Sequence, residues 1–461
     1  MAENTGTIVE KLATFACGLT FDDLPKEVVK KANDAFFDFA GCYYGAIKRD
    51  GLGQVAAGIA AANKTPESVI WGTGISCGTA EAALAMGTAG YHLEFDDGIS
   101  VSGHWGSASI PATFLAVARS GGDGRDLLTA IVAAYDVGSR ISRMFSPRLL
   151  KKHIHFPCMM GAFGAAAGYA KGMRMNADVL SGALSLAGLF PVGTYSTATG
   201  GASGKGLYSG WPNYLGVNAA RLSALGLRGD ADVMEAPDGF SRAVGLAPME
   251  EKYLEEAGWN LGKDFHIMLA YFKPYPCCRW LHAPVHALLG LMKEHDISRE
   301  DIDSIDIGGP EFAMMYDTRS GYESKVTCQY SIPYSVGAAA WYGKLGVNEY
   351  EEPARTNEEL RGFIGRISMR VDAELQAKFP EIFGVVLTLK LKDGRTFSVQ
   401  QGTPWGPDSP PSQDELIGKF MGLTEGVLTP DEQAEWVRLY RSGFESEGAF
   451  ERVLELTGRK V

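Results

Sequence analysis

The sequence contains no long uninterrupted apolar run. No window of the 461 residues reaches the roughly 18 consecutive apolar residues that a membrane-spanning helix needs. The first residues, MAENTGTIVEKLATFA, lack the basic stretch followed by an apolar segment that marks an export signal. We therefore expect a soluble, cytoplasmic protein.

Positive charge is also scarce, and the cysteines form no recognisable framework. With 43 Lys and Arg against 55 Asp and Glu, the formal net charge is −12, which argues against nucleic acid and against an anionic membrane surface as partners. An anionic ligand would need positive charge gathered locally. The seven cysteines are odd in number and scattered, which fits reduced intracellular thiols better than disulfides.

Apolar residues, in contrast, make up 46% of the chain, enough for large cores in two or three domains. They recur at helical spacing through most of residues 1–265, where abundant Ala and Gly allow helices to pack closely. After about residue 265, alternating patterns such as GVVLTLKLKDGRTFSVQ, with its Asp393-Gly394 turn, predict strands and a hairpin. We predict a mainly α protein with a second α+β domain: a helical domain over 1–265, a smaller α/β domain over 266–405, and C-terminal helices over 406–461 that pack back on the helical domain.

An acidic segment interrupts two Ala-rich helical runs and reads EFDDGISVSGHWGSASIPA. Asp97 and His104 lie seven residues apart in it, among glycines that allow close approach to a small ligand. A carboxylate beside an imidazole orients it and raises its pKa, which suits a general acid or base. The alternative is a capping loop, with Asp97 as a helix cap and His104 at the surface.

A second candidate segment is HIHFPCMMGAFGAAAGYA. His153, His155 and Cys158 could suggest zinc, but zinc needs three or four ligands and no second compact cluster supplies the rest. We favour a single imidazole at a helix N-terminus, where an anion is also stabilised.

The third candidate is Lys205, which lies between glycines in TATGGASGKGLYSGWPNY. A phosphate-binding loop would have Ser or Thr where Gly206 stands, and no strand leads into this segment, so we do not expect a nucleotide. Lys205 can still bind a carboxylate as a point charge. The alternative is a solvated surface lysine.

Further cations follow in FKPYPCCRWLHAPVHALLGL, where Lys273 and Arg279 together would suit a polycarboxylate. A weaker signal comes from Tyr316, Arg319 and Lys325, which offer hydroxyl and cationic groups ahead of a predicted helix.

The same segment could also suggest a metal site. Cys278, His282 and His286 have a spacing that could place them on one helical face. Pro284 instead predicts a helix that starts near residue 283, which leaves Cys278 and His282 outside it. The thiols can equally be small buried apolar groups.

Taken in order, these segments resemble the MmgE/PrpD family, and the similarity extends from about Thr7 to the C-terminal helices. The motifs that carry it are EFDDGISVSGHWGSASIP, HFPCMMGAFGAAAGYA, KGLYSGWPNYLGV, KPYPCCRWLH and QYSIPYS. The resemblance implies a large all-helical domain and a smaller, lid-like α/β domain, usually in homodimers, with the active site in the cleft between them. It also implies chemistry without a metal or an organic cofactor on small di- and tricarboxylates: 2-methylcitrate dehydration, cis-aconitate decarboxylation or epimerisation of an imino-dicarboxylate.

The resemblance also implies roles for individual residues. Glu94 occupies a position that is Asp in the decarboxylases, and Tyr316 is a looser match than the others. Three positions depart from the family pattern: Gly98 replaces a common Thr, while Trp105 and Tyr208 replace a common Pro and His and, with Trp211, predict a more aromatic pocket. The predicted catalytic residues are His104, His155, Asp97 and Lys205, and the predicted substrate-binding residues are Glu94, Lys273, Arg279, Cys278, His282, Tyr316 and Tyr208.

Chemistry next to a carboxylate passes through an enediolate-like species with additional negative charge, which nearby cations stabilise. We expect Lys205, Lys273 and Arg279 to do this, while His104 and His155 transfer protons and the acidic residues tune an imidazole. The sequence thus predicts a cofactor-independent lyase, a dehydratase or decarboxylase, acting on a small di- or tricarboxylate. An epimerase, a non-catalytic carboxylate-binding homologue and a metalloenzyme remain as alternatives.

Overall fold

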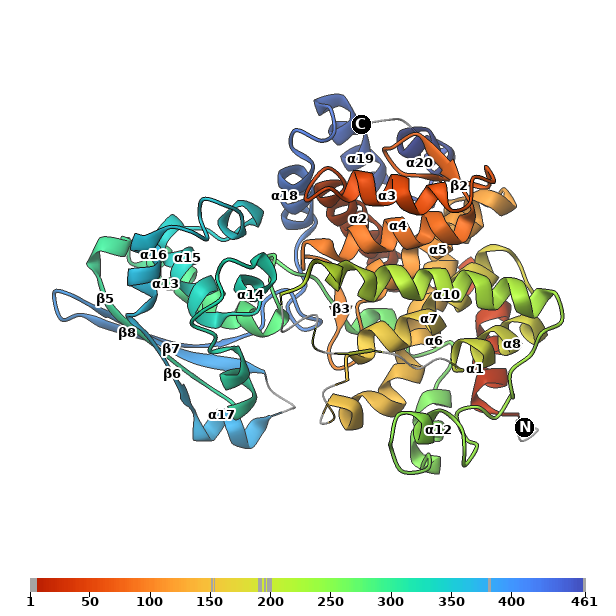
Figure 1. Ribbon diagram of the computed structural model, residues 1–461, viewed down its shortest axis with the longest axis horizontal. Helices are drawn as coiled ribbons and strands as arrows, with labels where there is room; N and C mark the ends of the chain where they lie inside the picture. The colour runs from red at the N-terminus through yellow and green to blue at the C-terminus, as the bar shows by residue number, and fades with distance from the viewer. Residues whose placement is uncertain are drawn as a thin grey trace.

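The computed structural model describes residues 6–150, 152, 154–189, 193, 194, 196, 201–379 and 383–458. It has a large, mostly helical domain and a smaller domain built around a four-stranded sheet, at the left of Figure 1. This confirms the predicted mainly α protein with a second α+β domain. Within the described residues, no helix combines the length and the apolar character needed to cross a membrane.

The large domain is formed mainly by the N-terminal half of the chain. Its helices are α1 (Ile8–Gly18), α2 (Lys26–Ile47), α3 (Leu52–Ala61), α4 (Thr79–His92), α5 (Trp105–Ser120), α6 (Gly124–Leu150), α7 (Phe156–Gly172), α8 (Ala177–Ala187), α10 (Leu207–Ala224), α11 (Phe240–Ala243) and α12 (Glu251–Gly258), with 3-10 turns η1 (Phe21–Asp23), η2 (Ser203–Gly206) and η3 (His266–Leu269). Two short antiparallel strand pairs accompany these helices: β1 (Ser68–Ile70) with β2 (Ile75–Cys77), and β3 (Gly98–Ile99) with β4 (Ala270–Tyr271).

The smaller domain packs helices against one mixed sheet of order β6-β5-β7-β8. Its strands are β5 (Ile302–Gly309), β6 (Ile367–Val371), β7 (Gly384–Leu391) and β8 (Thr396–Gly402); its helices are α13 (His282–Glu294), α14 (Lys325–Gln329), α15 (Ile332–Tyr342), α16 (Glu358–Ile364) and α17 (Ala373–Lys378), with η4 (Arg279–Leu281), η5 (Arg299–Asp301), η6 (Glu311–Tyr316) and η7 (Val347–Tyr350). Strands β5 and β6 are parallel and the other pairs antiparallel. The predicted hairpin is confirmed: β7 pairs with β8, and Gly394 in the turn adopts φ 91°, a conformation that glycine adopts without steric cost.

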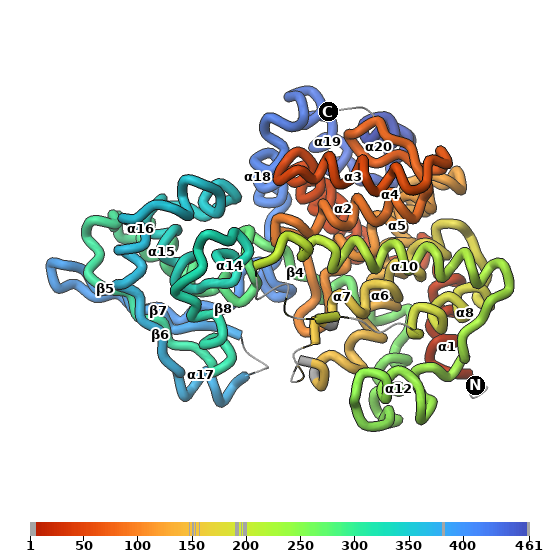
Figure 2. The backbone as a smooth tube through the Cα atoms, viewed as in Figure 1, coloured from red at the N-terminus to blue at the C-terminus, as the bar shows by residue number. Residues whose placement is uncertain are grey.

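The chain returns to the large domain at its C-terminal end (Figures 1 and 2), where α18 (Gln413–Thr424) and α19 (Pro430–Ser442) pack against α2 and α20 (Ala449–Gly458) packs against β1. The ring of Phe37 on α2 stacks on Tyr440 and on Phe420, with centroids 4.0 and 4.5 Å apart. The two crossings between domains run side by side, since the Phe272 N–H donates to the Trp405 carbonyl (3.0 Å). The N-terminal and C-terminal helices therefore share one core.

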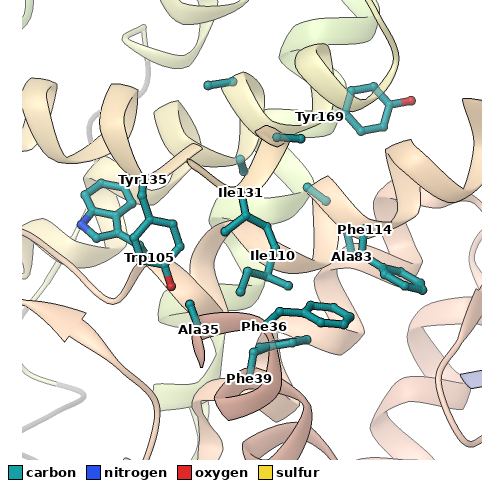
Figure 3. Close-up of a cluster of buried hydrophobic side chains, with 14 of the residues drawn as sticks. Ala35, Phe36, Phe39, Ala83, Trp105, Ile110, Phe114, Ile131, Tyr135 and Tyr169 are labelled. Carbon is teal, nitrogen blue, oxygen red and sulfur yellow. The ribbon is translucent and has the colours of Figure 1, made fainter. Parts of the chain in front are cut away.

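Close helix packing decides where two aromatic residues lie. Trp105 is 1% exposed and sits in the helical core near Tyr135 (Figure 3). It fills the space left by glycine, because a Cβ built at Gly138 would stand 2.2 Å from its ring. Trp211 lies at the surface, 44% exposed, and stacks on Tyr214. The expectation that Trp105 and Trp211 line an aromatic pocket is therefore wrong.

Glycine at a helix crossing gives a test of this packing. A Cβ at Gly216 on α10 would lie 2.6 Å from both the Cβ of Ala165 and the backbone N of Ala166 on α7. We expect Gly216→Ala to destabilise the protein by about 1–3 kcal/mol through overpacking. Gly58 in α3 is exposed and its Cβ would meet nothing within 4 Å, so Gly58→Ala should add about 0.5–1 kcal/mol from helix propensity. Thermal unfolding midpoints that move the same way in both variants would contradict this packing argument.

Candidate active site

Three helices begin at one place in the large domain. His104 is the N-cap of α5, His155 is the N-cap of α7, and Lys205 lies in η2 directly before α10. The hydroxyls of Ser107 and Ser209, 2.9 Å apart, join the first turns of α5 and α10. Helix N-termini present unpaired N–H groups and a partial positive charge. Three segments that are distant in the sequence thus form one site suited to an anion.

Glu94 holds two buried lysines at this site. Its carboxylate pairs with Lys205 and with Lys273, the latter at 3.0 Å, and its carbonyl also accepts from the Lys273 ammonium (3.0 Å). The Tyr330 hydroxyl donates to the same carboxylate (3.4 Å). Burial alone would raise the pKa of Glu94, but the charges of Lys205 and Lys273 outweigh it and hold that pKa well below its usual value. The site therefore contains a fixed carboxylate between two ammonium groups.

The short strand pair β3–β4 brings Lys273 to this position. Gly98 directly follows the acidic residues and pairs with Tyr271, two residues before Lys273. A Cβ at Gly98 would stand 2.6 Å from the Tyr271 hydroxyl oxygen, which explains why this chain has glycine there. Lys273 is fully buried; burial would lower its pKa, but the carboxylates of Glu94 and Asp96 raise it above its usual value.

The imidazole of His104 is oriented by a backbone group and a carboxylate. Its Nδ1 lies 2.9 Å from the Asp97 carbonyl oxygen, which can only accept, so Nδ1 carries a proton. The carboxylate beside it is that of Asp96, 3.5 Å from Nδ1 and also bonded to the Ser107 hydroxyl (2.5 Å). The sequence reasoning placed the Asp97 carboxylate in this role; the structure places Asp96 there instead.

The Asp97 carboxylate points into the helical domain. It accepts from the Gly106 N–H (2.9 Å) in the first turn of α5 and from the Tyr135 hydroxyl (2.6 Å). Burial raises its pKa to about 7; the charges of Asp38 and Asp96 act in the same direction, and its two hydrogen bonds oppose the shift. The Asp97 side chain thus caps the first turn of α5, as the capping alternative predicts. The Asp97 carbonyl, in contrast, accepts a hydrogen bond from His104.

His155 has the opposite arrangement of its ring nitrogens. Its Nδ1 accepts from the Cys158 N–H (3.4 Å), so the proton of the neutral ring is on Nε2. Its ring stacks on Tyr208, with centroids 3.9 Å apart. Burial, together with the nearby His104 and Lys205, lowers its pKa to about 3. His155 is therefore a neutral N–H donor near pH 7.

Arg279 and His282 contact residues next to the Lys–Glu–Lys cluster and do not pair with Glu94. The Arg279 guanidinium stacks on the Tyr271 ring at 3.5 Å instead of joining the lysines on Glu94, and burial lowers its pKa to about 10. His282 begins α13, slightly earlier than the sequence predicts, and its Nε2 donates to the Cys277 carbonyl (3.1 Å). Burial, followed by the charge of Lys273, lowers the pKa of His282 well below its usual value.

Cys278 and Tyr316 are hydrogen-bonded to each other through their side chains, and burial raises the pKa of the thiol to about 12. Both belong to the hydrophobic core of the smaller domain, and the ring of Tyr316 is 6.4 Å from that of Tyr330. Arg319 pairs with Asp317, and Lys325 pairs with Asp50 and Glu351, so neither cation joins the lysines on Glu94.

Sequence reasoning missed two residues of the QYSIPYS motif that join the domains. The Gln329 amide donates to the carbonyls of Leu93 (2.8 Å) and Pro276 (3.0 Å), and Tyr330 reaches Glu94. The motif is not one helix, because α14 ends at Gln329 and Ser331 caps α15. Serine followed two residues later by proline is the signal that could have shown this break.

The metal alternative required a cluster of ligands. His153 lies outside the described residues. Among the residues that the structure does describe, no three His, Cys, Asp or Glu side chains are grouped so that they could hold a metal ion.

The fold and this site define a two-domain protein with a buried Lys–Glu–Lys cluster and two histidine helix caps where the domains meet. The chain belongs to the MmgE/PrpD family: residues 10–250 match the MmgE/PrpD N-terminal domain and residues 275–441 the MmgE/PrpD C-terminal domain.

Curated relatives match over most of their length. The cis-aconitate decarboxylase of Mus musculus is 23% identical over 445 residues, covering 92% of this chain and 88% of the relative. The enzyme of the same name from Homo sapiens is 23% identical, covering 95% and 92%, and that of Aspergillus terreus is 21% identical, covering 91% and 90%.

The unusual protonation of Asp97 predicts a pH-dependent stability difference. Its pKa of about 7 in the folded protein exceeds the unfolded value of about 3.9, so between these values the folded state binds more protons. The contribution of Asp97 to the free energy of unfolding therefore falls as pH rises from about 4 to 7. Asp97→Asn cannot ionise, so its urea midpoint relative to wild type should rise across this range and then level off.

The exposed residue Asp408 provides a matched control for the loss of one charge, as Asp408→Asn. A difference between Asp97→Asn and wild type that stays constant with pH would contradict the assigned protonation.

Proposed function

We propose that this protein is a cofactor-independent lyase that acts on a small di- or tricarboxylate. The observation that carries the proposal is the convergence of two histidine N-caps on the lysines that Glu94 holds. Helix N-termini and ammonium groups bind carboxylates, and the same groups stabilise the negative charge that develops when a bond next to a carboxylate breaks.

The substrate is bound through its carboxylates at the starts of α5, α7 and α10. The Nε2–H of His155 donates to a carboxylate oxygen of the substrate. Lys205, whose charge acts on His155, supplies an ammonium group to the same site. Lys273 already uses two of its N–H groups on Glu94, so it acts mainly through its charge. The low dielectric of these buried surroundings strengthens each of these interactions.

His104 is the proton carrier. Its Nδ1–H is fixed on the Asp97 carbonyl, so Nε2 holds the lone pair in the neutral ring. Asp96 stabilises the imidazolium that forms when Nε2 takes up a proton. His155 is held neutral and does not share this role.

In a decarboxylation, the bond between the substrate carbon and one carboxylate breaks and carbon dioxide leaves. The electron pair remains on the substrate as an enediolate-like anion. The His104 imidazolium, which has taken up its Nε2 proton from solvent, then protonates this anion at carbon and returns to the neutral ring. In a dehydration, Nε2 of His104 removes the proton next to a carboxylate, and the proton returns to the departing hydroxide as water. Both reactions need one proton carrier and fixed cations.

Decarboxylation of cis-aconitate is the first reaction to test, because the curated relatives that match nearly the whole chain are named for it. An epimerase requires a second proton carrier on the opposite face of the same carbon. The low pKa of His155 makes it unsuited to that task, which favours the lyase.

Proton NMR in D₂O tests the proposal directly. Purified protein is incubated with cis-aconitate, citrate, 2-methylcitrate and a set of amino- and hydroxy-dicarboxylates. New vinyl signals, with release of carbon dioxide or water, are expected for one of them. Deuterium uptake at one carbon without a new skeleton would identify an epimerase instead, and no change with any compound would overturn the lyase proposal.

Replacing the proton carrier tests its role. We expect His104→Ala to lower kcat by about 100-fold or more while the thermal midpoint stays near that of wild type. His286→Ala provides the control, since His286 is exposed and bonded to Tyr275 away from the lysines. Turnover close to wild type in His104→Ala would refute the assignment.

A further inference from the structure

The hydroxyl of Tyr91 is buried in the middle of the candidate active site, and no described residue pairs with it. Tyr91 lies in the last turn of α4 and is 1% exposed. Its Oη is one of the buried polar atoms that have no hydrogen-bond partner among the described residues. Leaving a buried hydroxyl unsatisfied costs about 1–3 kcal/mol, so such a group calls for a specific explanation.

The surroundings of Tyr91 are those of the candidate active site. Its ring meets His104 edge-on, with centroids 5.1 Å apart, and the Lys205 ammonium lies 4.6 Å from its ring centroid. It also packs with Tyr208, the residue that stacks on His155. Tyr91 thus contacts His104, Lys205 and the tyrosine that packs against His155.

The hydroxyl keeps its proton at neutral pH. Burial raises the pKa of Tyr91 well above its usual value, and the carboxylates of Glu94 and Asp96 act in the same direction. A neutral phenol is a hydrogen-bond donor, and it is a stronger partner for a charged oxygen than for a neutral one.

Two other buried tyrosines, Tyr135 and Tyr44, differ from Tyr91 in the partner of the hydroxyl or in the surroundings of the ring. Tyr135 is also fully buried, but its hydroxyl donates to Asp97. Tyr44 has an unpartnered buried hydroxyl as well, yet its ring packs among Trp71 and Trp436 in the core. Among these three, only Tyr91 combines an unpartnered hydroxyl with contacts to the candidate catalytic side chains.

We propose that Tyr91 is a further catalytic residue, an inference that rests on the proposed function. Its hydroxyl donates a hydrogen bond to an oxygen of the bound substrate carboxylate. That oxygen gains negative charge as the adjacent bond breaks, so the hydrogen bond strengthens towards the transition state. No proton is transferred in this contact. Tyr91 and Lys205 then stabilise the anion together, while His104 handles the proton.

Tyr91→Phe tests the contact because it removes a single oxygen. Since that oxygen has no hydrogen-bond partner among the described residues, the unliganded variant should melt at or above the wild-type temperature. Its kcat/KM should fall by about 10- to 100-fold, as expected for the loss of one hydrogen bond to a charged oxygen. Tyr44→Phe makes the same change at an equally unpartnered hydroxyl in the core, so it should also melt at or above the wild-type temperature, but its kcat/KM should stay at the wild-type value.

Two outcomes would overturn the contact with substrate. One is a Tyr91→Phe variant with wild-type kcat/KM. The other is a fall in its unliganded midpoint as large as that of Tyr135→Phe, which breaks a known hydrogen bond; this would show that the Tyr91 hydroxyl has a structural partner, such as a buried water.

Ligand binding separates this inference from the proposed function. Propane-1,2,3-tricarboxylate, a saturated tricarboxylate, should raise the thermal midpoint of wild type and raise it less in Tyr91→Phe. Equal shifts in the two proteins would overturn the Tyr91 contact alone. A wild-type protein that turns over no compound of the NMR panel would overturn the proposed function. If it also gains no stability from this probe, the Tyr91 contact is overturned with it.

Discussion

The arrangement of the site depends on one constraint: two ammonium groups are buried almost completely and share the Glu94 carboxylate. A buried lysine without a counter-charge is strongly disfavoured. Lys205 stands at the start of α10 and Lys273 follows β4, so the shared carboxylate fixes both elements against the acidic segment. Buried ion pairs contribute little net stability because both partners lose their hydration. Under the proposed function, their value lies in holding charge where the anionic substrate binds.

The same carboxylate connects the site to the smaller domain. Glu94 itself adopts φ 56°, a left-handed conformation that is unfavourable for a residue with a side chain. The preceding carbonyl, that of Leu93, is held by the Gln329 amide, and the Glu94 side chain meets the Tyr330 hydroxyl. Contacts from the small domain thus help to maintain a strained backbone at the centre of the site, as is common where strain serves function. The contacts between the two domains and the lysine pair therefore meet at the same short segment, Leu93 and Glu94.

Periodicity and short motifs predicted much of this structure. The alternation of apolar and polar residues around Asp393-Gly394 predicted the β7–β8 hairpin. The motifs identified the residues that the structure brings together, namely Glu94, His104, His155, Lys205 and Lys273. The sequence could not predict which of Asp96 and Asp97 faces the His104 imidazole, because the two residues are adjacent in an irregular loop that has no helical or strand periodicity. Trp105 was misplaced because its cavity is made by Gly138 and Gly164, distant residues whose approach no local pattern reveals.

The two histidines differ in what their ring nitrogens contact, and the proposed function gives them two different roles for this reason. Both precede long helices, but the Nδ1 of His104 meets a carbonyl and that of His155 meets the N–H of the helix that it caps. A carbonyl stabilises a protonated nitrogen, whereas a helix N–H stabilises an unprotonated one and opposes a positive charge on the ring. Asp96 strengthens the first preference, and burial strengthens the second. One imidazole is thereby able to carry a proton and the other to donate a fixed hydrogen bond, a division that suits breaking a bond next to a carboxylate more than exchanging protons across two faces of a carbon.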